Sequence, residues 1–174
     1  MIVQLLGILA ALLVVLAVYA WFKPMTFRIE RSAVINAPPE TIHEYLADFR
    51  KWVGWSPWEA LDPDMMRTYK GPGEGVGAGY AWEGRKAGSG NMLITRSDPQ
   101  TGISLDLNFT KPFKANNQTD ITLTKEGDST RVNWAMHGPH PYLHRLMSVV
   151  FSMDKMVGKD FEKGLAKLKS LSEG

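Results

Sequence analysis

The sequence predicts an α+β domain, made of an antiparallel sheet and a long C-terminal helix, behind a single membrane-spanning helix. Three observations lead to this fold class. The first part of the chain has no charge, the middle holds seven short runs of alternating apolar and polar residues, and the last part carries an apolar stripe at helical spacing. With 174 residues, the chain has room for one domain of ordinary size.

Composition excludes several classes of function. The 20 basic and 18 acidic side chains leave a net charge of only +2, which disfavours nucleic acid as a partner. The sequence has no cysteine, so disulfides, thiolate metal sites and cysteine nucleophiles are excluded. The stability of the domain must therefore come from its core.

The N-terminal segment is predicted to be a membrane anchor. Between Met1 and Phe22 there is no charged side chain, and a helix of this length spans about 33 Å, enough for the hydrocarbon core of a bilayer. Tyr19 and Lys23 suit the headgroup layer, and Pro24 ends the helix. We expect an anchor over residues 1–23 and a folded domain over residues 24–174.

A cleaved signal peptide is the alternative for this segment, because Ala20 is a small residue before a possible cut at Trp21. No Lys or Arg precedes the apolar run, which favours the retained anchor. Lys23, Arg28 and Arg31 follow the helix, so the positive-inside rule places the domain in the cytoplasm. The sequence thus predicts a single-pass membrane protein.

The folded part begins with a strand and two helices. Residues 26–35 alternate with the period of two that predicts a strand. The run Asn36-Ala-Pro-Pro-Glu40 is typical of a helix start, and apolar spacing extends that helix to about Arg50. Indoles at intervals of three, broken by a proline, then predict a second, irregular helix carrying Trp52, Trp55 and Trp58.

Six further strands are expected, over residues 66–70, 79–83, 90–97, 103–110, 118–125 and 130–137. The turns between them are short, which implies an antiparallel meander. The five glycines between Gly71 and Gly79 lead into a strand rather than a helix, so they predict a hairpin and not a phosphate-binding loop. From Leu146 to Leu168, apolar residues three or four apart predict one long helix that covers the sheet.

Several motifs resemble one known family. The runs Ala37-Pro-Pro-Glu40, Asp48-Phe-Arg-Lys-Trp52, Trp55-Ser-Pro-Trp58 and Gly71-Pro-Gly-Glu-Gly75 are similar to those of the polyketide cyclase/dehydrase branch of the START-like, or SRPBCC, superfamily. The resemblance implies the Bet v 1-like helix-grip fold, in which a curved antiparallel sheet of about seven strands wraps around the C-terminal helix. It also implies a deep cavity between them that receives apolar molecules.

The sequence and this resemblance together favour a membrane-anchored START-like domain that binds a hydrophobic small molecule or lipid. A polyketide cyclase/dehydratase-like enzyme is the second hypothesis, and it needs polar groups that the strand alternation does not place in the cavity. An interaction module whose cavity is filled by its own side chains is the third. A carboxylate or histidine facing the cavity would favour the enzyme.

The ligand-binding wall is predicted from the apolar strand faces and the start of the C-terminal helix. We expect it to contain Trp55, Trp58, Tyr80, Trp82, Met92, Leu105, Leu107, Phe109, Trp134, Met136, Met147 and Phe151. Core packing is the alternative for each of these residues. For the two indoles of the second helix, the alternatives are a gate at the mouth and an anchor to the core.

No catalytic residue, metal site or cofactor is predicted. Asp106 and Asp120 fall on the strand face opposite the apolar one, and Glu83 and His137 each follow a residue expected to point inward. His140 and His144 have a spacing of four, but prolines flank the first of them, which favours a polar turn over a metal site. A lysine stripe on the last helix is predicted to be a solvated face, at Lys155, Lys159, Lys163 and Lys167.

Overall fold

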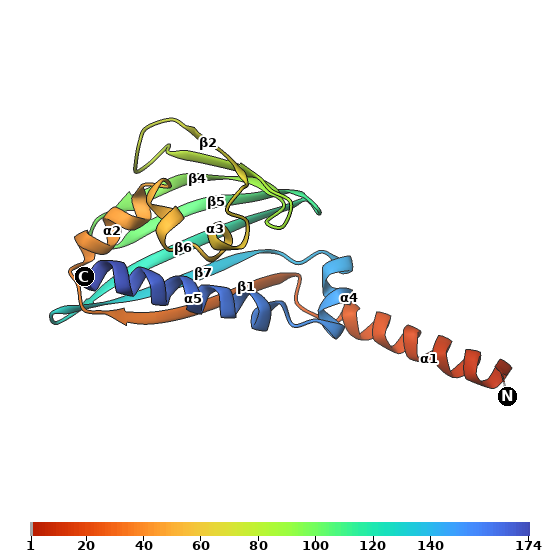
Figure 1. Cartoon of the computed structure of the whole chain (residues 1–174). Helices are drawn as coiled ribbons and strands as arrows, with labels where there is room; N and C mark the ends of the chain where they lie inside the picture. The colour runs from red at the N-terminus through yellow and green to blue at the C-terminus, as the bar shows by residue number, and fades with distance from the viewer. Residues whose placement is uncertain (1) are drawn as a thin grey trace.

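The computed structural model describes residues 2–174 and has the α+β fold expected from the sequence (Figure 1). Met1, with which the predicted anchor begins, lies outside the described residues. The elements in chain order are α1 Ile2–Trp21, β1 Thr26–Ile35, α2 Pro39–Ala47, the 3₁₀ helix η1 Lys51–Gly54, α3 Pro57–Leu61, β2 Met66–Lys70, β3 Gly79–Glu83, β4 Ser89–Asp98, β5 Gly102–Lys111, β6 Ala115–Glu126, β7 Ser129–Pro139, α4 Tyr142–Val150 and α5 Met153–Glu173.

One antiparallel sheet contains all seven predicted strands, in the order β1-β7-β6-β5-β4-β3-β2. The first strand lies at one edge of the sheet, beside the last strand of the chain. There β1 pairs with β7 from Thr26 opposite Pro139 to Ile35 opposite Thr130. The sheet curves around α5, which lies along its concave face (Figure 1). The predicted helix-grip architecture is confirmed.

The glycine-rich loop is the predicted hairpin between β2 and β3. Gly71, Gly75 and Gly77 have φ angles of 76°, 75° and 88°, a backbone region that favours glycine. A Cβ atom on Gly71 would also collide with the carbonyl oxygen of Gly77. These residues therefore shape a tight turn.

The irregular tryptophan helix is confirmed as η1 followed by α3. Trp52 donates its indole N–H to the carbonyl oxygen of Leu46 at 3.0 Å, and Trp55 donates to that of Tyr45 at 3.1 Å. Both bonds satisfy carbonyls in the last turn of α2, which have no partner inside that helix. The indoles thus fix η1 against α2.

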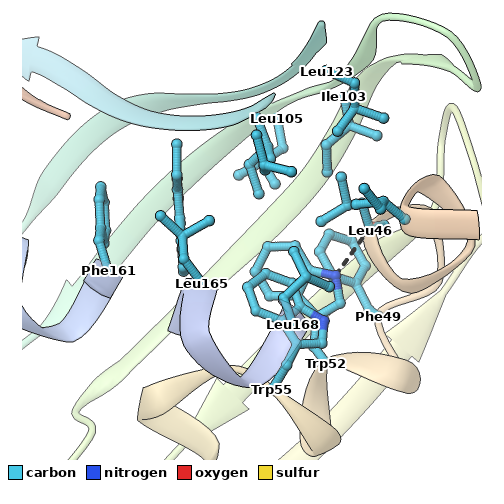
Figure 2. Packing of buried hydrophobic residues seen from close by; sticks show 14 of the residues in the cluster. Leu46, Phe49, Trp52, Trp55, Ile103, Leu105, Leu123, Phe161, Leu165 and Leu168 are labelled. Carbon is cyan, nitrogen blue, oxygen red and sulfur yellow. Dashed lines mark hydrogen bonds between the residues drawn. The ribbon is translucent and has the colours of Figure 1, made fainter. Parts of the chain in front are cut away.

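The apolar core is densely packed at the C-terminal end of α5. Leu168 lies against Trp52 and Trp55 there, with Leu46 and Phe49 beside them (Figure 2). Leu168 and Trp55 are fully buried. This end of the domain is closed.

The predicted long C-terminal helix is confirmed as α5, but its expected start at Leu146 is wrong, because the apolar stripe is divided between α4 and α5. Phe151 is extended, with φ −116° and ψ 124°, and ends α4. Ser152 then caps α5 by accepting a hydrogen bond from the backbone N–H of Lys155 at 3.3 Å. The apolar spacing continues on both sides of the break, so the periodicity alone concealed it, and the cap serine was the missed signal.

The N-terminal helix α1 is long and apolar enough to span a membrane by length and composition. Its C-terminal end is held by α4 (Figure 1). Arg145 donates to the carbonyl oxygens of Trp21 and Lys23 at 2.9 and 3.1 Å, and Lys23 donates to the carbonyl oxygen of Ser148 at 2.8 Å. Tyr142 donates its hydroxyl to the carbonyl oxygen of Ala17 at 3.0 Å. Helix α4 is therefore fastened to the last turns of α1.

Candidate functional site

A cavity of about 130 Å³ lies between the concave face of the sheet, helix α3 and the N-terminal half of α5. Most of its wall is aromatic or aliphatic, as is usual for small-molecule sites. The lining residues are Trp52, Ser56, Trp58, Glu59, Met65, Tyr80, Trp82, Ala87, Met92, Leu105, Leu107, Phe109, Thr119, Trp134, Met136, Val157 and Phe161.

The structure brings most of the sequence-predicted wall together. Strands β3 to β7 supply alternate residues to the concave face, which places their apolar side chains on one side of the sheet. The predicted residues that line the cavity are Trp58, Tyr80, Trp82, Met92, Leu105, Leu107, Phe109, Trp134 and Met136. Their contact with a ligand stays a prediction.

Three predicted wall residues lie elsewhere. Trp55 is fully buried beneath the wall, where it packs edge-on against Trp134, so it anchors the core and does not gate a mouth. Met147 and Phe151 are 46% and 62% exposed, because the break between α4 and α5 turns them away from the sheet. The residues of α5 that line the cavity in their place are Val157 and Phe161.

A buried polar cluster stands in the wall, and strand alternation did not reveal it. Glu59, which is 5% exposed, accepts hydrogen bonds from the Tyr80 hydroxyl at 2.6 Å and from Arg67 Nε at 2.7 Å. Arg67 also donates to the carbonyl oxygens of Met65 and Pro63. The guanidinium therefore holds both the carboxylate and the nearby loop, through three of its five N–H donors.

Electrostatics couple these three side chains. The pKa of Tyr80 lies above its usual value mainly because the hydroxyl is buried, and secondly because it donates a hydrogen bond to Glu59. The hydrogen bond to Glu59 likewise raises the pKa of Arg67. The Tyr80 hydroxyl therefore stays protonated at neutral pH and donates to the carboxylate.

Strand alternation placed no carboxylate in the cavity, and the one in its wall, Glu59, comes from a helix instead. Glu59 is on α3, whereas Arg67 and Tyr80 are on β2 and β3, which pair so that Tyr69 stands opposite Tyr80. No sequence spacing connects residues this far apart. The one usable signal was the position of Glu59 directly after Trp58 in a short helix expected to face the core.

Two further polar groups in the wall have no hydrogen-bond partner among the residues that the structure describes. Thr119 Oγ1 and Trp134 Nε1 are buried without a hydrogen bond, and their side chains are only 4% and 2% exposed. Phe161 stacks on the Trp134 ring with centroids 4.2 Å apart, which fixes the indole in place. A buried polar group without a partner is costly, so both atoms are candidates for contacting a ligand.

Other ionisable groups lie outside the cavity, as the alternation predicted. Asp120 accepts from Ser104 at 2.6 Å and lies 3.1 Å from His137 Nε2. Burial raises the pKa of Asp120, but these two hydrogen bonds together lower it by more. The pKa of Asp120 therefore lies below its usual value. Glu83 pairs with Lys111 at 3.0 Å in an exposed position. Within residues 2–174, no group of three or more histidines and carboxylates could hold a metal ion.

The cavity lies toward the end of the sheet where α1 joins the domain. Strand pairing places Glu83, Ser89 and Lys111 at this end, and Thr26, the first residue of β1, opposite Pro139. The lining residues nearest to it are half-buried, namely Trp82, Ala87, Phe109 and Val157, whereas Glu59, Tyr80, Trp134 and Phe161 are buried. The exposure gradient thus points to a mouth on the α1 side.

Comparison with known proteins places the chain among proteins of one architecture. The family described as "Polyketide cyclase / dehydrase and lipid transport" matches residues 26–173. No curated protein matches the chain. Among solved structures, protein CV1439 from Chromobacterium violaceum has a TM-score of 0.60 at 17% identity, covering 87% of this chain and 99% of that protein.

Two other solved structures have the same fold. DynU16, from the dynemicin biosynthetic locus, has a TM-score of 0.58 at 13% identity and covers 82% of this chain and 46% of its own. Ara h 8.0201 has a TM-score of 0.53 at 13% identity and covers 83% of this chain and 96% of its own. At these identities the likeness establishes the fold alone.

Proposed function

Because the chain belongs to the polyketide cyclase/dehydrase and lipid transport family, we propose that it is a membrane-anchored START-like protein that binds an apolar molecule from the bilayer. The observation that carries the proposal is the cavity of about 130 Å³, which the protein's own side chains leave unfilled. Native cores pack with few voids larger than a water molecule. A space of this size beside α5 is therefore suited to a ligand.

The size of the cavity favours a ring-sized ligand. A cavity of about 150 Å³ lined by apolar residues holds benzene, whereas the acyl chains of a phospholipid need far more room. A cyclic molecule, or the cyclic end of an isoprenoid lipid whose chain leaves through the mouth, suits the space. Its wall of indole, phenol and thioether side chains favours aromatic or unsaturated rings.

Membrane attachment is the second part of the proposal, with an anchor over residues 1–23 and the binding domain over residues 24–174. Apolar residues four apart on α4 and at its end face outward, namely Leu143, Met147 and Phe151. Because α4 is fastened to the end of α1, this stripe would lie in the headgroup layer once α1 spans the bilayer. The mouth of the cavity would then open close to the membrane.

A cytoplasmic position for the domain is also proposed, and it depends mainly on Lys23. Arg28 pairs with Glu30, and Arg31 pairs with Asp154 and Glu162, so both arginines serve the fold of the domain. Replacing Lys23 with an acidic residue and adding a lysine at the N-terminus is expected to move the domain to the opposite side of the membrane. Digestion of the domain by protease added outside sealed vesicles measures its orientation.

The test of ligand binding is native mass spectrometry of the full chain, purified from cells in detergent micelles. We expect a discrete added mass, which solvent extraction then identifies. Val157→Phe places a larger side chain in the cavity and should abolish the added mass, whereas Met156→Phe, at the neighbouring exposed position, should retain it. A clean protein mass after apolar compounds are offered, or an unchanged adduct in Val157→Phe, contradicts the proposal.

Acid–base chemistry on the bound molecule is a second candidate function, favoured by the Glu59 carboxylate in the cavity wall. A carboxylate beside a phenol is a possible proton acceptor for an acidic C–H or O–H group. The extracted ligand should then differ in mass or retention time between the wild type and Glu59→Gln. Identical ligands from both proteins favour binding without turnover.

A further inference from the structure

Two unpartnered donors in the cavity restrict what the ligand carries. A Trp indole N–H only donates, so Trp134 Nε1 needs an acceptor, while the Thr119 hydroxyl either donates or accepts. They lie on adjacent strands, since Ile121 stands opposite Trp134 and Thr119 opposite Met136. Both residues line the cavity, so a ligand atom that accepts hydrogen bonds is a suitable partner for each of them.

Charge restricts the ligand further. Among the described lining residues, Glu59 has the only carboxylate, and neither Lys nor Arg contributes to the wall. Arg67 is not among the lining residues, and it donates to Glu59 and to two backbone carbonyls. A bound carboxylate or phosphate would thus be desolvated near a like charge without a counter-ion, which is strongly unfavourable.

We infer that the cavity selects a neutral, ring-sized molecule whose carbonyl oxygen accepts hydrogen bonds from Thr119 Oγ1 and Trp134 Nε1. A carbonyl oxygen has two lone pairs and no proton of its own, so it accepts from both donors. The ring packs against the apolar wall, and Glu59 excludes anionic analogues. This inference rests on the proposed function, because it describes the ligand of the same cavity.

The first experiment compares three probes of one shape: indane, indanone and indane carboxylate. Each is titrated by calorimetry into the full chain in detergent micelles, with binding to empty micelles subtracted. We expect indanone to bind about tenfold more tightly than indane, because it adds two hydrogen bonds, and the carboxylate to bind most weakly. The indole N–H resonance of Trp134, assigned with Trp134→Phe, should shift with indanone and much less with indane.

Variants assign the preference to the two donors. Thr119→Val keeps the shape of the side chain and removes the hydroxyl, so indanone should bind about three- to fivefold more weakly while indane is unaffected. Thr124→Val, on the same strand but exposed on the other face, is the matched control and should change neither affinity.

The outcomes separate the inference from the proposed function. Equal affinities for indane and indanone, or tightest binding of the carboxylate, would overturn the inference while the cavity remains a binding site. A Thr119→Val variant that loses both probes equally, or neither, also overturns it. If no probe binds the wild-type chain, the proposed function fails and the inference fails with it.

Discussion

Glu59, Arg67 and Tyr80 form the most distinctive polar contact of the domain at the scale of single residues. The Glu59 and Arg67 side chains are 4% and 21% exposed, so their ion pair at 2.7 Å is shielded from water. The pair of Glu126 and Arg131 has the same separation, 2.7 Å, but is exposed. The two pairs thus differ mainly in burial, which makes them a matched comparison.

Glu59→Gln is expected to lower the free energy of unfolding by about 2 kcal/mol, because Arg67 loses its buried counter-ion. Glu126→Gln should cost less than about 0.5 kcal/mol, since exposed ion pairs contribute little. Urea unfolding of the full chain in micelles, followed by tryptophan fluorescence, measures both values. Equal losses would show that burial does not strengthen the Glu59 contact.

Tyr80 predicts a dependence of stability on alkaline pH. Its pKa in the folded protein is raised by burial and by Glu59, so the unfolded chain loses this proton first as pH rises above about 10. The contribution of Tyr80 to stability is therefore complete below pH 10 and decreases above it. Tyr80→Phe should make the decline in the free energy of unfolding above about pH 10 less steep, measured by urea unfolding at each pH. An identical slope in both proteins would contradict the assignment.

At the scale of elements, the close approach of α5 to the sheet depends on glycine at one position. A Cβ atom on Gly164 would lie 2.8 Å from Trp134 Cζ3 and 3.1 Å from Pro57 Cδ, which are both rigid groups. A Cβ atom on Gly158 would meet the guanidinium of Arg31, the end of a flexible side chain that pairs with Asp154 and Glu162. The same substitution on one helix thus has two different consequences.

Gly164→Ala should lower the free energy of unfolding by about 2 kcal/mol, because the added methyl group displaces α5 from Trp134. Gly158→Ala should change it by less than about 1 kcal/mol, since the better helix propensity of alanine offsets the weakened ion pairs of Arg31. Thermal unfolding monitored by circular dichroism compares the two variants. A larger loss in Gly158→Ala would contradict this account of the helix contact.

Helix α4 is expected to contact lipid through its outward stripe. The sequence lacks cysteine, so Met147→Cys provides a unique site for an environment-sensitive fluorophore. In vesicles, quenchers attached near the lipid headgroups should reduce its emission strongly. Ser170→Cys, near the end of α5 far from α1, should be quenched little (Figure 1). Equal quenching at both sites would place α4 away from the bilayer.

At the scale of the whole molecule, the core is packed at one end and open at the other. Leu168 is fully buried at the closed end, whereas Leu107 is half-buried in the cavity wall. A side chain beside a void has fewer contacts to lose. The domain thus has a packed end and an end that contains the cavity, and the cavity end is the one near α1.

Leu168→Ala should therefore cost about 3 kcal/mol of unfolding free energy, in the usual range for a buried leucine. Leu107→Ala should cost about 1 kcal/mol, because its site is already bordered by empty space. Urea unfolding of the full chain without added ligand gives both values. If Leu107→Ala lowered the free energy of unfolding as much as Leu168→Ala, the cavity would have to be filled by side chains.

The sequence by itself determined the elements of this protein. Each strand from β1 to β7 and the apolar helix α1 were predictable because their patterns are local, with a period of two for strands and an uncharged run for α1. The resemblance of the motifs around Trp52 and Gly71 to one family added the helix-grip arrangement of these elements. Alternation also identified the cavity face of strands β3 to β7, since the side-chain direction follows from it.

Only the tertiary structure decided which residues meet. Glu59, Arg67 and Tyr80 come from three elements, and their contact depends on strand register and on the docking of α3, which no local period encodes. Met147 and Phe151 kept the apolar spacing of a buried helix, yet the break at Ser152 turned them outward. Periodicity specifies the face of an element, whereas packing against other elements decides what that face contacts.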